Sequence, residues 1–101
     1  MGEELTIPVV IPAYEPDDKL IKFCKDLHKN GFKNIIVVND GSSTGYDALF
    51  YETAKVEGCT VLRHAVNQGK GRALKTAFNY ILNQFSDGGG RLYYSGLRWP
   101  A

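Results

Sequence analysis

Short apolar runs alternate with amphipathic stretches along this chain. The runs at 9–11, 35–38 and 59–62 are almost free of charge and rich in β-branched residues, which is typical of buried strands. Stretches with apolar residues at helical spacing follow each of them, at 17–30, 46–56 and 71–85. The order β-α-β-α-β-α predicts a three-layer α/β/α domain with a parallel sheet, because strands that are apolar on both faces must be covered by helices on both sides.

The helical stretches show which residues should face the sheet. The predicted apolar face of the last helix comprises Leu74, Ala77, Phe78, Ile81, Leu82 and Phe85, and that of the first helix comprises Leu20, Phe23, Cys24, Leu27 and His28. Asp17 and Asp18 suit the positive end of the first helix, and Gly31 suits its end. Pro8 has no N–H to give, so we expect it at the start of the first strand or on its open side.

Composition narrows the class of protein. The chain has 101 residues, enough for one small domain, and its net charge of +1 gives no broad basic surface for nucleic acid. Cys24 and Cys59 lack metal-ligand spacing and are expected to be free thiols in a reducing compartment. There is no signal peptide pattern and no apolar run of membrane-spanning length, so we expect a cytoplasmic protein, associated with a membrane in a full-length parent.

The three strand-to-helix turns contain the least ordinary residues. They are Pro12 to Glu15 after the first strand, Asn39 to Ser43 after the second, and Asn67 to Arg72 after the third. Right-handed crossovers place all three turns at one end of a parallel sheet. In open α/β sheets that end is where ligands bind.

Each turn suits a different part of a nucleotide. Tyr14 could pack against a base, and Asp40 could accept a hydrogen bond from a base N–H or a ribose hydroxyl. Lys70 and Arg72 lie at the start of a helix, where backbone N–H groups favour phosphate, and Gly69 allows close approach of the backbone. Taken singly, these features are better explained by loop packing, a tight turn and solvated charges. Together at one sheet end they favour nucleotide binding.

Common nucleotide and metal motifs are missing from the sequence. The Gly69–Gly71 segment has neither the frame of a P-loop nor the third glycine of a dinucleotide fingerprint. His28 and His64 are far apart without paired ligands, so neither is assigned to a metal.

Segments 9–15, 36–42 and 67–74 resemble the amino-terminal half of family-two glycosyltransferases, over about residues 5–86 of this chain. The resemblance implies the A-type nucleotide-diphospho-sugar transferase fold and inverting transfer of a sugar to an acceptor. The 67–74 loop is most similar to that of enzymes that make polyprenyl-phosphate sugars. It also implies roles: Pro12, Ala13, Tyr14 and Glu15 wall the base and ribose site, Asp40 binds the base with Gly41 and Ser42 shaping its turn, and Asn67, Gly69, Lys70 and Arg72 close around the base and diphosphate.

The sequence departs from this family after residue 87. The family's Asp-x-Asp motif, which holds Mg²⁺ or Mn²⁺ on the diphosphate, and its later general base have no counterpart, so we assign no catalytic or metal-binding residue. We expect a truncated nucleotide-sugar-binding domain at 1–87 and a tail at 88–101 that is foreign to the family. Codons for 95–101, read one base forward, can spell the missing motif, and we hypothesise a frameshift near 88–90, which the gene's nucleotide sequence would test.

Truncation has expected consequences for activity and assembly. Affinity for the sugar nucleotide should be weak without the metal, and this chain alone should not transfer sugar. The first strand would lie at an open sheet edge, which predicts a homo-oligomer or pairing of residues 92–94 with that edge.

Two other functions are compatible with the pattern. One is a non-catalytic nucleotide-binding or interaction module that uses the same crevice. The other is a sugar-1-phosphate nucleotidyltransferase, which ranks lower because those enzymes have a Gly-rich loop directly after the first strand and the Pro12–Glu15 turn has no glycine.

Overall fold

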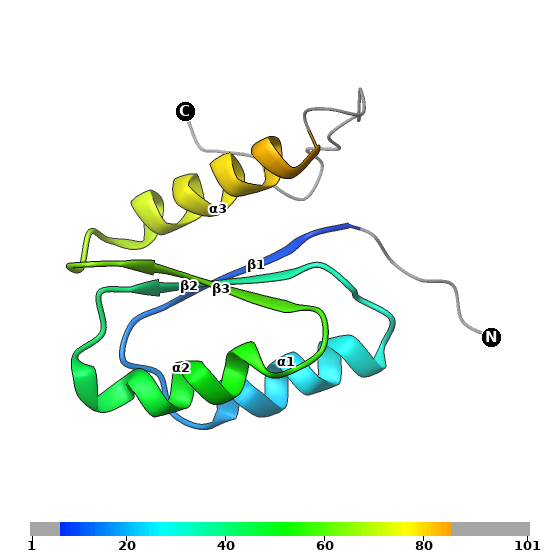
Figure 1. Cartoon of the computed structure of the whole chain (residues 1–101), viewed down its shortest axis with the longest axis horizontal. Helices are drawn as coiled ribbons and strands as arrows, with labels where there is room; N and C mark the ends of the chain where they lie inside the picture. The colour runs from blue at the N-terminus through cyan, green and yellow to red at the C-terminus, as the bar shows by residue number, and fades with distance from the viewer. Residues whose placement is uncertain (1–6, 86–101) are drawn as a thin grey trace.

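The computed structural model describes residues 7–85, and these form a parallel sheet between two helical layers (Figure 1). The elements are β1 (Val9–Ala13), α1 (Lys19–Lys29), β2 (Ile35–Asp40), a 3₁₀ turn (Thr44–Tyr46), α2 (Asp47–Ala54), β3 (Cys59–His64) and α3 (Lys70–Phe85). The predicted order and the α/β class are confirmed. The expectations for the 88–101 tail, including pairing of residues 92–94, lie outside the described residues.

The sheet has the order β1-β2-β3, and both pairs of neighbours are parallel. β2 is central, and all six of its residues are buried. α1 and α2 lie on one face of the sheet and α3 lies on the other (Figure 1). α3 follows β3 but packs against β2 and β1, so the chain turns back across the sheet after its third strand.

Each face of the sheet has its own core. On the side of α1 and α2 the buried residues are Ala13, Leu20, Cys24, Ile35, Val37 and Phe50. On the side of α3 they are Ile36, Val38, Ala73, Ala77 and Ile81. Alternate β2 residues therefore face opposite layers, as the pleat of a strand requires.

The buried stripe of α3 differs from the predicted one. It comprises Ala73, Ala77 and Ile81, one residue per turn, while Leu74 and Leu82 are half-buried beside it. Ala77 and Ile81 belong to the predicted face, whereas Ala73 was not predicted. Two alanines at the contact allow the helix to lie close to the sheet. In α1, Leu20 and Cys24 are buried as predicted, but Phe23 is 49% exposed, so its assignment to the apolar face was wrong.

The ends of α1 follow from local chemistry. Its first residue is Lys19, whose N–H donates to Oδ1 of Asp17 at 3.0 Å, so the predicted acidic pair stands just outside the helix. Gly31, at a φ of 99°, takes the chain out of the helix, as predicted. That left-handed conformation is easily adopted only by glycine.

The two cysteines are both free, as expected, and both lie on the side of α1 and α2. The neighbouring Cys24 thiol and burial both raise the pKa of Cys59, so this thiol stays protonated at neutral pH.

No helix within residues 7–85 combines the length and apolar character needed to cross a bilayer.

β1 lies at one edge of the described sheet. The N–H of Val9 donates to the carbonyl of Asn34 at 2.8 Å, so Val9 and every second residue after it face β2. Pro8, Val10 and Pro12 therefore face the open side, where a missing N–H interrupts no pairing with β2. This confirms the position expected for Pro8.

Candidate functional site

Residues at the carboxyl ends of the strands line a cavity of about 310 Å³. These strand ends lie at the left of the sheet in Figure 1. The lining residues of the cavity are Pro12, Ala13, Tyr14, Asp40, Asn67, Gly69 and Lys70. They come from all three turns singled out in the sequence. Glu15, Gly41, Ser42 and Arg72, which were also predicted for the site, lie in the same turns but are not among the lining residues.

Asp40 is the centre of this end of the sheet. It is the last residue of β2 and only 3% exposed. Its Oδ1 accepts the N–H of Gln68 at 2.9 Å, and its Oδ2 accepts the N–H of Gly69 at 2.8 Å. The side-chain amide of Asn67 donates to the Asp40 carbonyl oxygen at 3.3 Å. The turn after β3 is thus fastened to the end of β2.

These bonds determine the charge state of Asp40. Burial by itself would raise the pKa of this carboxyl, but the hydrogen bonds from Gln68, His64 and Gly69 outweigh it and lower the pKa below the ordinary 3.8. Asp40 is therefore ionised at neutral pH. Each carboxylate oxygen accepts up to two hydrogen bonds, so the bonds made within residues 7–85 leave Oδ2 one acceptor position.

His64 is the partner of Asp40 that the sequence analysis missed. It is 7% exposed, and its Nδ1 lies 2.7 Å from Oδ1 of Asp40. Its Nε2 lies 2.7 Å from the hydroxyl of Thr76 in α3. The predicted third strand ended at residue 62, whereas β3 continues to His64 and pairs it with Asp40 in the parallel register. A polar residue two positions beyond a predicted strand was the available signal.

The turn after β1 is fastened to the turn after β2. The backbone N–H of Glu15 donates to the Ser42 hydroxyl at 2.9 Å, and the Ser43 hydroxyl donates to Oε2 of Glu15 at 3.1 Å. Glu15 has a φ of 48°, a left-handed conformation that costs energy for a residue with a Cβ. Glu15 and Ser42 therefore hold in place the turn that carries Tyr14, although neither of them lines the cavity.

Gly41 lies under the turn after β3. Its φ is 74°, and a Cβ added there would collide with the backbone of Val66 and Asn67. The two turns can therefore cross only because this position has no side chain.

Three exposed residues line the cavity: an aromatic residue, a lysine and Asn67. Tyr14 is 52% exposed, and Lys70 is exposed at the first position of α3. Arg72 is exposed in the same helical turn. The site thus has a flat apolar surface at the β1 side and positive charge at the α3 side, with the Asp40 carboxylate between them.

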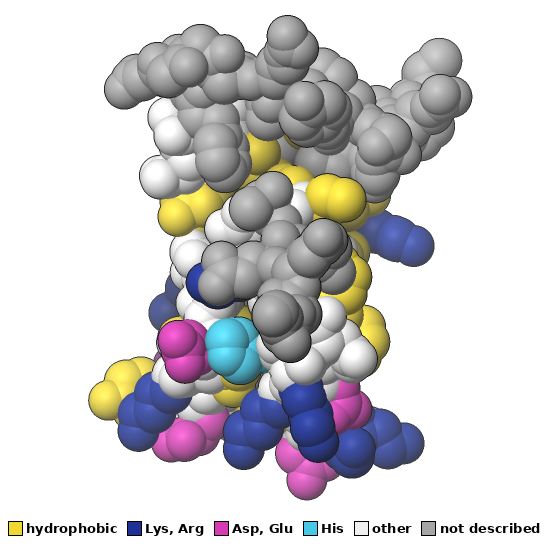
Figure 2. All heavy atoms as spheres, turned by 90° about the vertical axis from the view of Figure 1, so that its right-hand side faces the viewer, with side chains coloured by type: hydrophobic (Ala, Val, Ile, Leu, Met, Phe, Trp, Pro, Cys, Tyr) yellow, Lys and Arg dark blue, Asp and Glu magenta, His cyan; other side chains and the backbone are white. Residues whose placement is uncertain are grey.

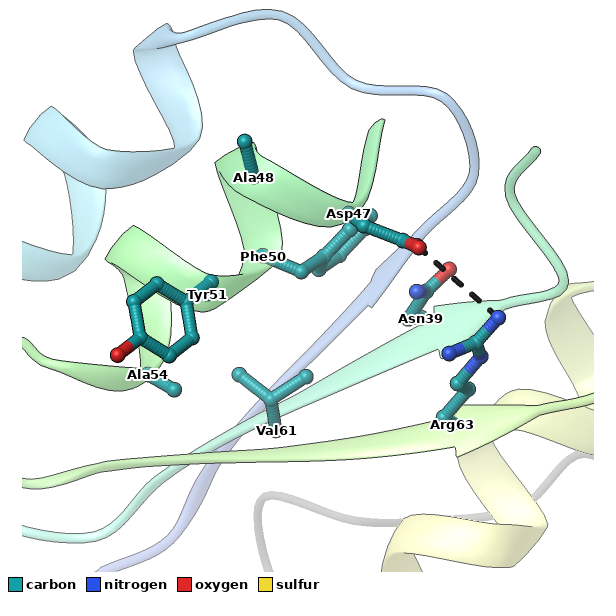
Figure 3. A pocket seen from close by; sticks show the side chains of 8 residues that line it. All are labelled: Asn39, Asp47, Ala48, Phe50, Tyr51, Ala54, Val61 and Arg63. Atoms are coloured by element: carbon teal, nitrogen blue, oxygen red, sulfur yellow. Dashed lines mark ion pairs between the residues drawn. The ribbon is translucent and has the colours of Figure 1, made fainter. Parts of the chain in front are cut away.

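A second hollow, of about 550 Å³, lies between α2 and β3 (Figure 3). Phe50, Tyr51 and Val61 give it an apolar lining, and Arg63 and Asp47 form an ion pair at 4.0 Å beside it. Both members of that pair are about half exposed, so the pair contributes little to stability. No residue of the predicted site lines this hollow.

The end of the molecule away from the cavity is shown in Figure 2. Basic and acidic side chains crowd its lower part, and most of the apolar side chains in view lie above them. In α1, Lys22 and Asp26 form an ion pair at 3.3 Å, and both side chains are well exposed. This mixture of signs is typical of a solvated surface.

The divalent metal implied by the family resemblance does not fit the residues that the structure describes. Within 7–85 no three His, Cys, Asp or Glu side chains lie close enough together to hold a metal ion. Asp40, the acidic residue that lines the cavity, already accepts hydrogen bonds from three protein groups.

The model of the family "Glycosyl transferase family 2" matches residues 9–85 of the chain. The chain belongs to glycosyl transferase family 2. The match runs from the first residue of β1 to the last residue of α3, so it includes all three turns that form the cavity.

The chain is also similar to an uncharacterised protein of the archaeon Methanocaldococcus jannaschii. The two are 42% identical over 74 residues, which make up 73% of this chain and 29% of that protein. This chain therefore spans less than a third of the relative's length. No solved structure matches the chain significantly.

Replacing Gly41 by alanine should destabilise the family 2 domain. The new Cβ collides with the backbone of the turn after β3, at a φ that alanine adopts only under strain, so we expect a loss of about 2 kcal/mol or more in the free energy of unfolding. Urea denaturation measures it. Gly45→Ala is the control, because a Cβ at Gly45 meets nothing within 4 Å, and its change should stay within about 0.5 kcal/mol. Equal changes in both variants would contradict the crossing of the turns.

Asp40→Asn should lower stability in a pH-dependent way. Because the folded-state pKa of Asp40 lies below its ordinary value, ionisation stabilises the fold at all pH values above about 4, and this stabilisation disappears as the pH falls through the folded-state pKa. At pH 7 we expect a loss of about 1–3 kcal/mol, since an amide cannot accept all three donors.

Denaturation curves from pH 7 to pH 2 test this, and the gap between Asp40→Asn and the parent should narrow at the acid end. Asp26→Asn, at an exposed ion pair, is the matched control and should change stability by less than about 0.5 kcal/mol. A gap that stays constant over the whole pH range would show that ionised Asp40 is not what holds the turn.

Proposed function

We propose that this chain binds the nucleotide of a nucleotide-diphospho-sugar in the 310 Å³ cavity, as the donor-binding part of an inverting glycosyltransferase. The observation that carries the proposal is the lining of the cavity: an exposed aromatic ring, an ionised carboxylate and a lysine, one from each turn. The family match supports a nucleotide-diphospho-sugar as the ligand rather than a nucleotide without a sugar.

The charges in the cavity suggest how the nucleotide lies. The Asp40 carboxylate would repel a phosphate, and it already accepts the N–H groups of Gln68 and Gly69. The free acceptor position on Oδ2 can instead receive an N–H of the base, with Tyr14 packed against the ring. The diphosphate then lies toward Lys70, where the ammonium group and the first turn of α3 favour negative charge.

We also propose an acceptor and a limit to activity. By resemblance of the 67–74 loop, the acceptor of the whole enzyme is a polyprenyl phosphate. A polyprenyl phosphate is already ionised near neutral pH and needs no general base, but within the described residues no three His, Cys, Asp or Glu side chains could hold the metal that would neutralise the departing diphosphate. This chain therefore binds the donor without completing transfer, and Mg²⁺ or Mn²⁺ acts only in the whole enzyme.

A non-catalytic nucleotide-binding module would use the same cavity. Binding to the nucleotide alone does not separate the two functions, but preference for a sugar nucleotide over the free nucleoside diphosphate supports the donor role. We also propose that this chain forms a homo-oligomer through the open edge of β1.

Nucleotide binding should depend on Tyr14 and Lys70. We expect UDP, GDP or their sugar conjugates to shift the NMR signals of residues around the cavity, with weak affinity. Lys70→Ala should weaken binding about tenfold, the loss expected for a hydrogen bond to a charged group, and Tyr14→Ala should weaken it several-fold.

Matched controls are Lys22→Ala, an exposed lysine in α1, and Tyr51→Ala, an exposed tyrosine beside the hollow between α2 and β3. Neither should change the affinity. The proposal is wrong if the parent chain shows no shifts at millimolar nucleotide, or if the control variants weaken binding as much as the site variants do.

Sugar transfer by this chain alone should be undetectable. The assay incubates the purified chain with radiolabelled UDP- or GDP-sugar, Mn²⁺ and a polyprenyl phosphate. We expect no transfer because the described residues offer no group that could hold the metal on the departing diphosphate. Transfer of label to the lipid, lost in Lys70→Ala, would overturn the limit on activity while leaving the donor-binding proposal intact.

A further inference from the structure

The turn between β3 and α3 has little apolar packing to hold it. Ala65, Asn67 and Gln68 are exposed, and Val66 is 63% exposed. Its position depends on polar bonds, above all those that the Gln68 and Gly69 N–H groups donate to the Asp40 carboxylate. Whatever fixes the rotation of that carboxylate therefore fixes the turn.

His64 is placed to fix that rotation. An ionised carboxylate only accepts hydrogen bonds, so Nδ1 of His64 must carry the proton that it shares with Oδ1 of Asp40 at 2.7 Å. The imidazole cannot turn about its own axis without also breaking the 2.7 Å bond between Nε2 and the Thr76 hydroxyl. Both nitrogens of the buried ring are thus engaged, one with β2 and one with α3.

The hydrogen bond to Thr76 ties the His64 ring to a helix that cannot easily move. Thr76 is in the second turn of α3, and that helix is anchored on the sheet by Ala73 and Ala77 on either side of it, both fully buried. A continuous path of hydrogen bonds therefore leads from the core-packed part of α3, through His64 and Asp40, to the backbone of the turn at the cavity.

We propose that His64, held by Thr76, is a positioning residue for the nucleotide site: it orients the Asp40 carboxylate so that the turn at 67–70 is closed and one acceptor position on Oδ2 stays available to the ligand. The inference rests on the proposed nucleotide binding for its effect on affinity, and on the structure alone for its effect on the turn. His64 does not touch the ligand in this arrangement. It acts through Asp40.

The test removes the hydrogen bond between Thr76 and His64 and keeps the imidazole itself. His64→Ala would leave the Asp40 charge buried with fewer partners and could unfold the domain, so the informative variant is Thr76→Val, which keeps the shape of the side chain and removes its hydroxyl. Thr76→Ser restores the hydroxyl. The matched control is Thr53→Val in α2, where a fully buried threonine donates to the Leu49 carbonyl at 2.8 Å, far from the cavity in the opposite helical layer.

Two readouts apply to each variant: NMR hydrogen exchange of the Gln68 and Gly69 amides, with the Val37 amide in β2 as the reference for global stability, and titration with UDP and GDP. In Thr76→Val we expect exchange at Gln68 and Gly69 to rise about tenfold relative to Val37, and affinity to fall about three- to tenfold. Thr76→Ser should recover most of both. Thr53→Val should lower the melting temperature and change neither.

The outcomes separate this inference from the proposed function. If the parent chain binds neither nucleotide, the proposed function fails, and the exchange rates still decide whether Thr76 and His64 order the turn. If Thr76→Val exchanges like the parent, or binds nucleotide as tightly as the parent while its turn is loosened, the positioning role is wrong. The same holds if Thr53→Val reproduces both effects.

Discussion

The ionised carboxylate of Asp40, buried at the end of the central strand, is the constraint on which this end of the molecule depends. A carboxylate out of contact with water destabilises a fold unless donors surround it. Here the donors are the imidazole of His64, the last residue of β3, and two backbone N–H groups of the turn that follows it, so all three lie within the segment 64–69. The charge is therefore tolerated only while that segment is in place.

The other features of the cavity follow from this requirement. The turn after β3 can reach Asp40 only by crossing the turn after β2, and the crossing requires a residue without Cβ at position 41. The Ser42 hydroxyl next to it then holds the Glu15 backbone, which sets the wall carrying Tyr14. A carboxylate in the middle also divides the cavity into a part suited to N–H groups of a base and a part suited to phosphate. Both parts arise from the same buried charge.

Much of this could be predicted from the sequence, because it depends on local patterns. Alternating apolar runs and amphipathic stretches gave the six elements, and parallel topology brought the three turns to one end. The pairing of His64 with Asp40 could not be found this way, since it depends on strand register and on two further residues of β3. Phe23 was misassigned because helical spacing shows which side chains share a face and does not show how far the sheet extends beneath them. Asp40 was expected to serve a ligand, and no sequence pattern indicated how much of its hydrogen bonding the protein itself would use.

The prolines of β1 have a consequence for what can join the sheet. Along the open side from residue 8 to residue 12, Val10 alone can donate an N–H, while no strand among residues 7–85 pairs with the carbonyl oxygens of Pro8, Val10 and Pro12. This edge is therefore rich in acceptors and poor in donors. A strand from another molecule would find few N–H donors here for its own carbonyl oxygens. Unselective pairing with this edge is therefore weak, which lowers the risk of aggregation. A strand pairs well with this edge only if it supplies N–H groups to these carbonyl oxygens. The two prolines, at alternate positions of the open side, therefore limit which strands can pair with β1.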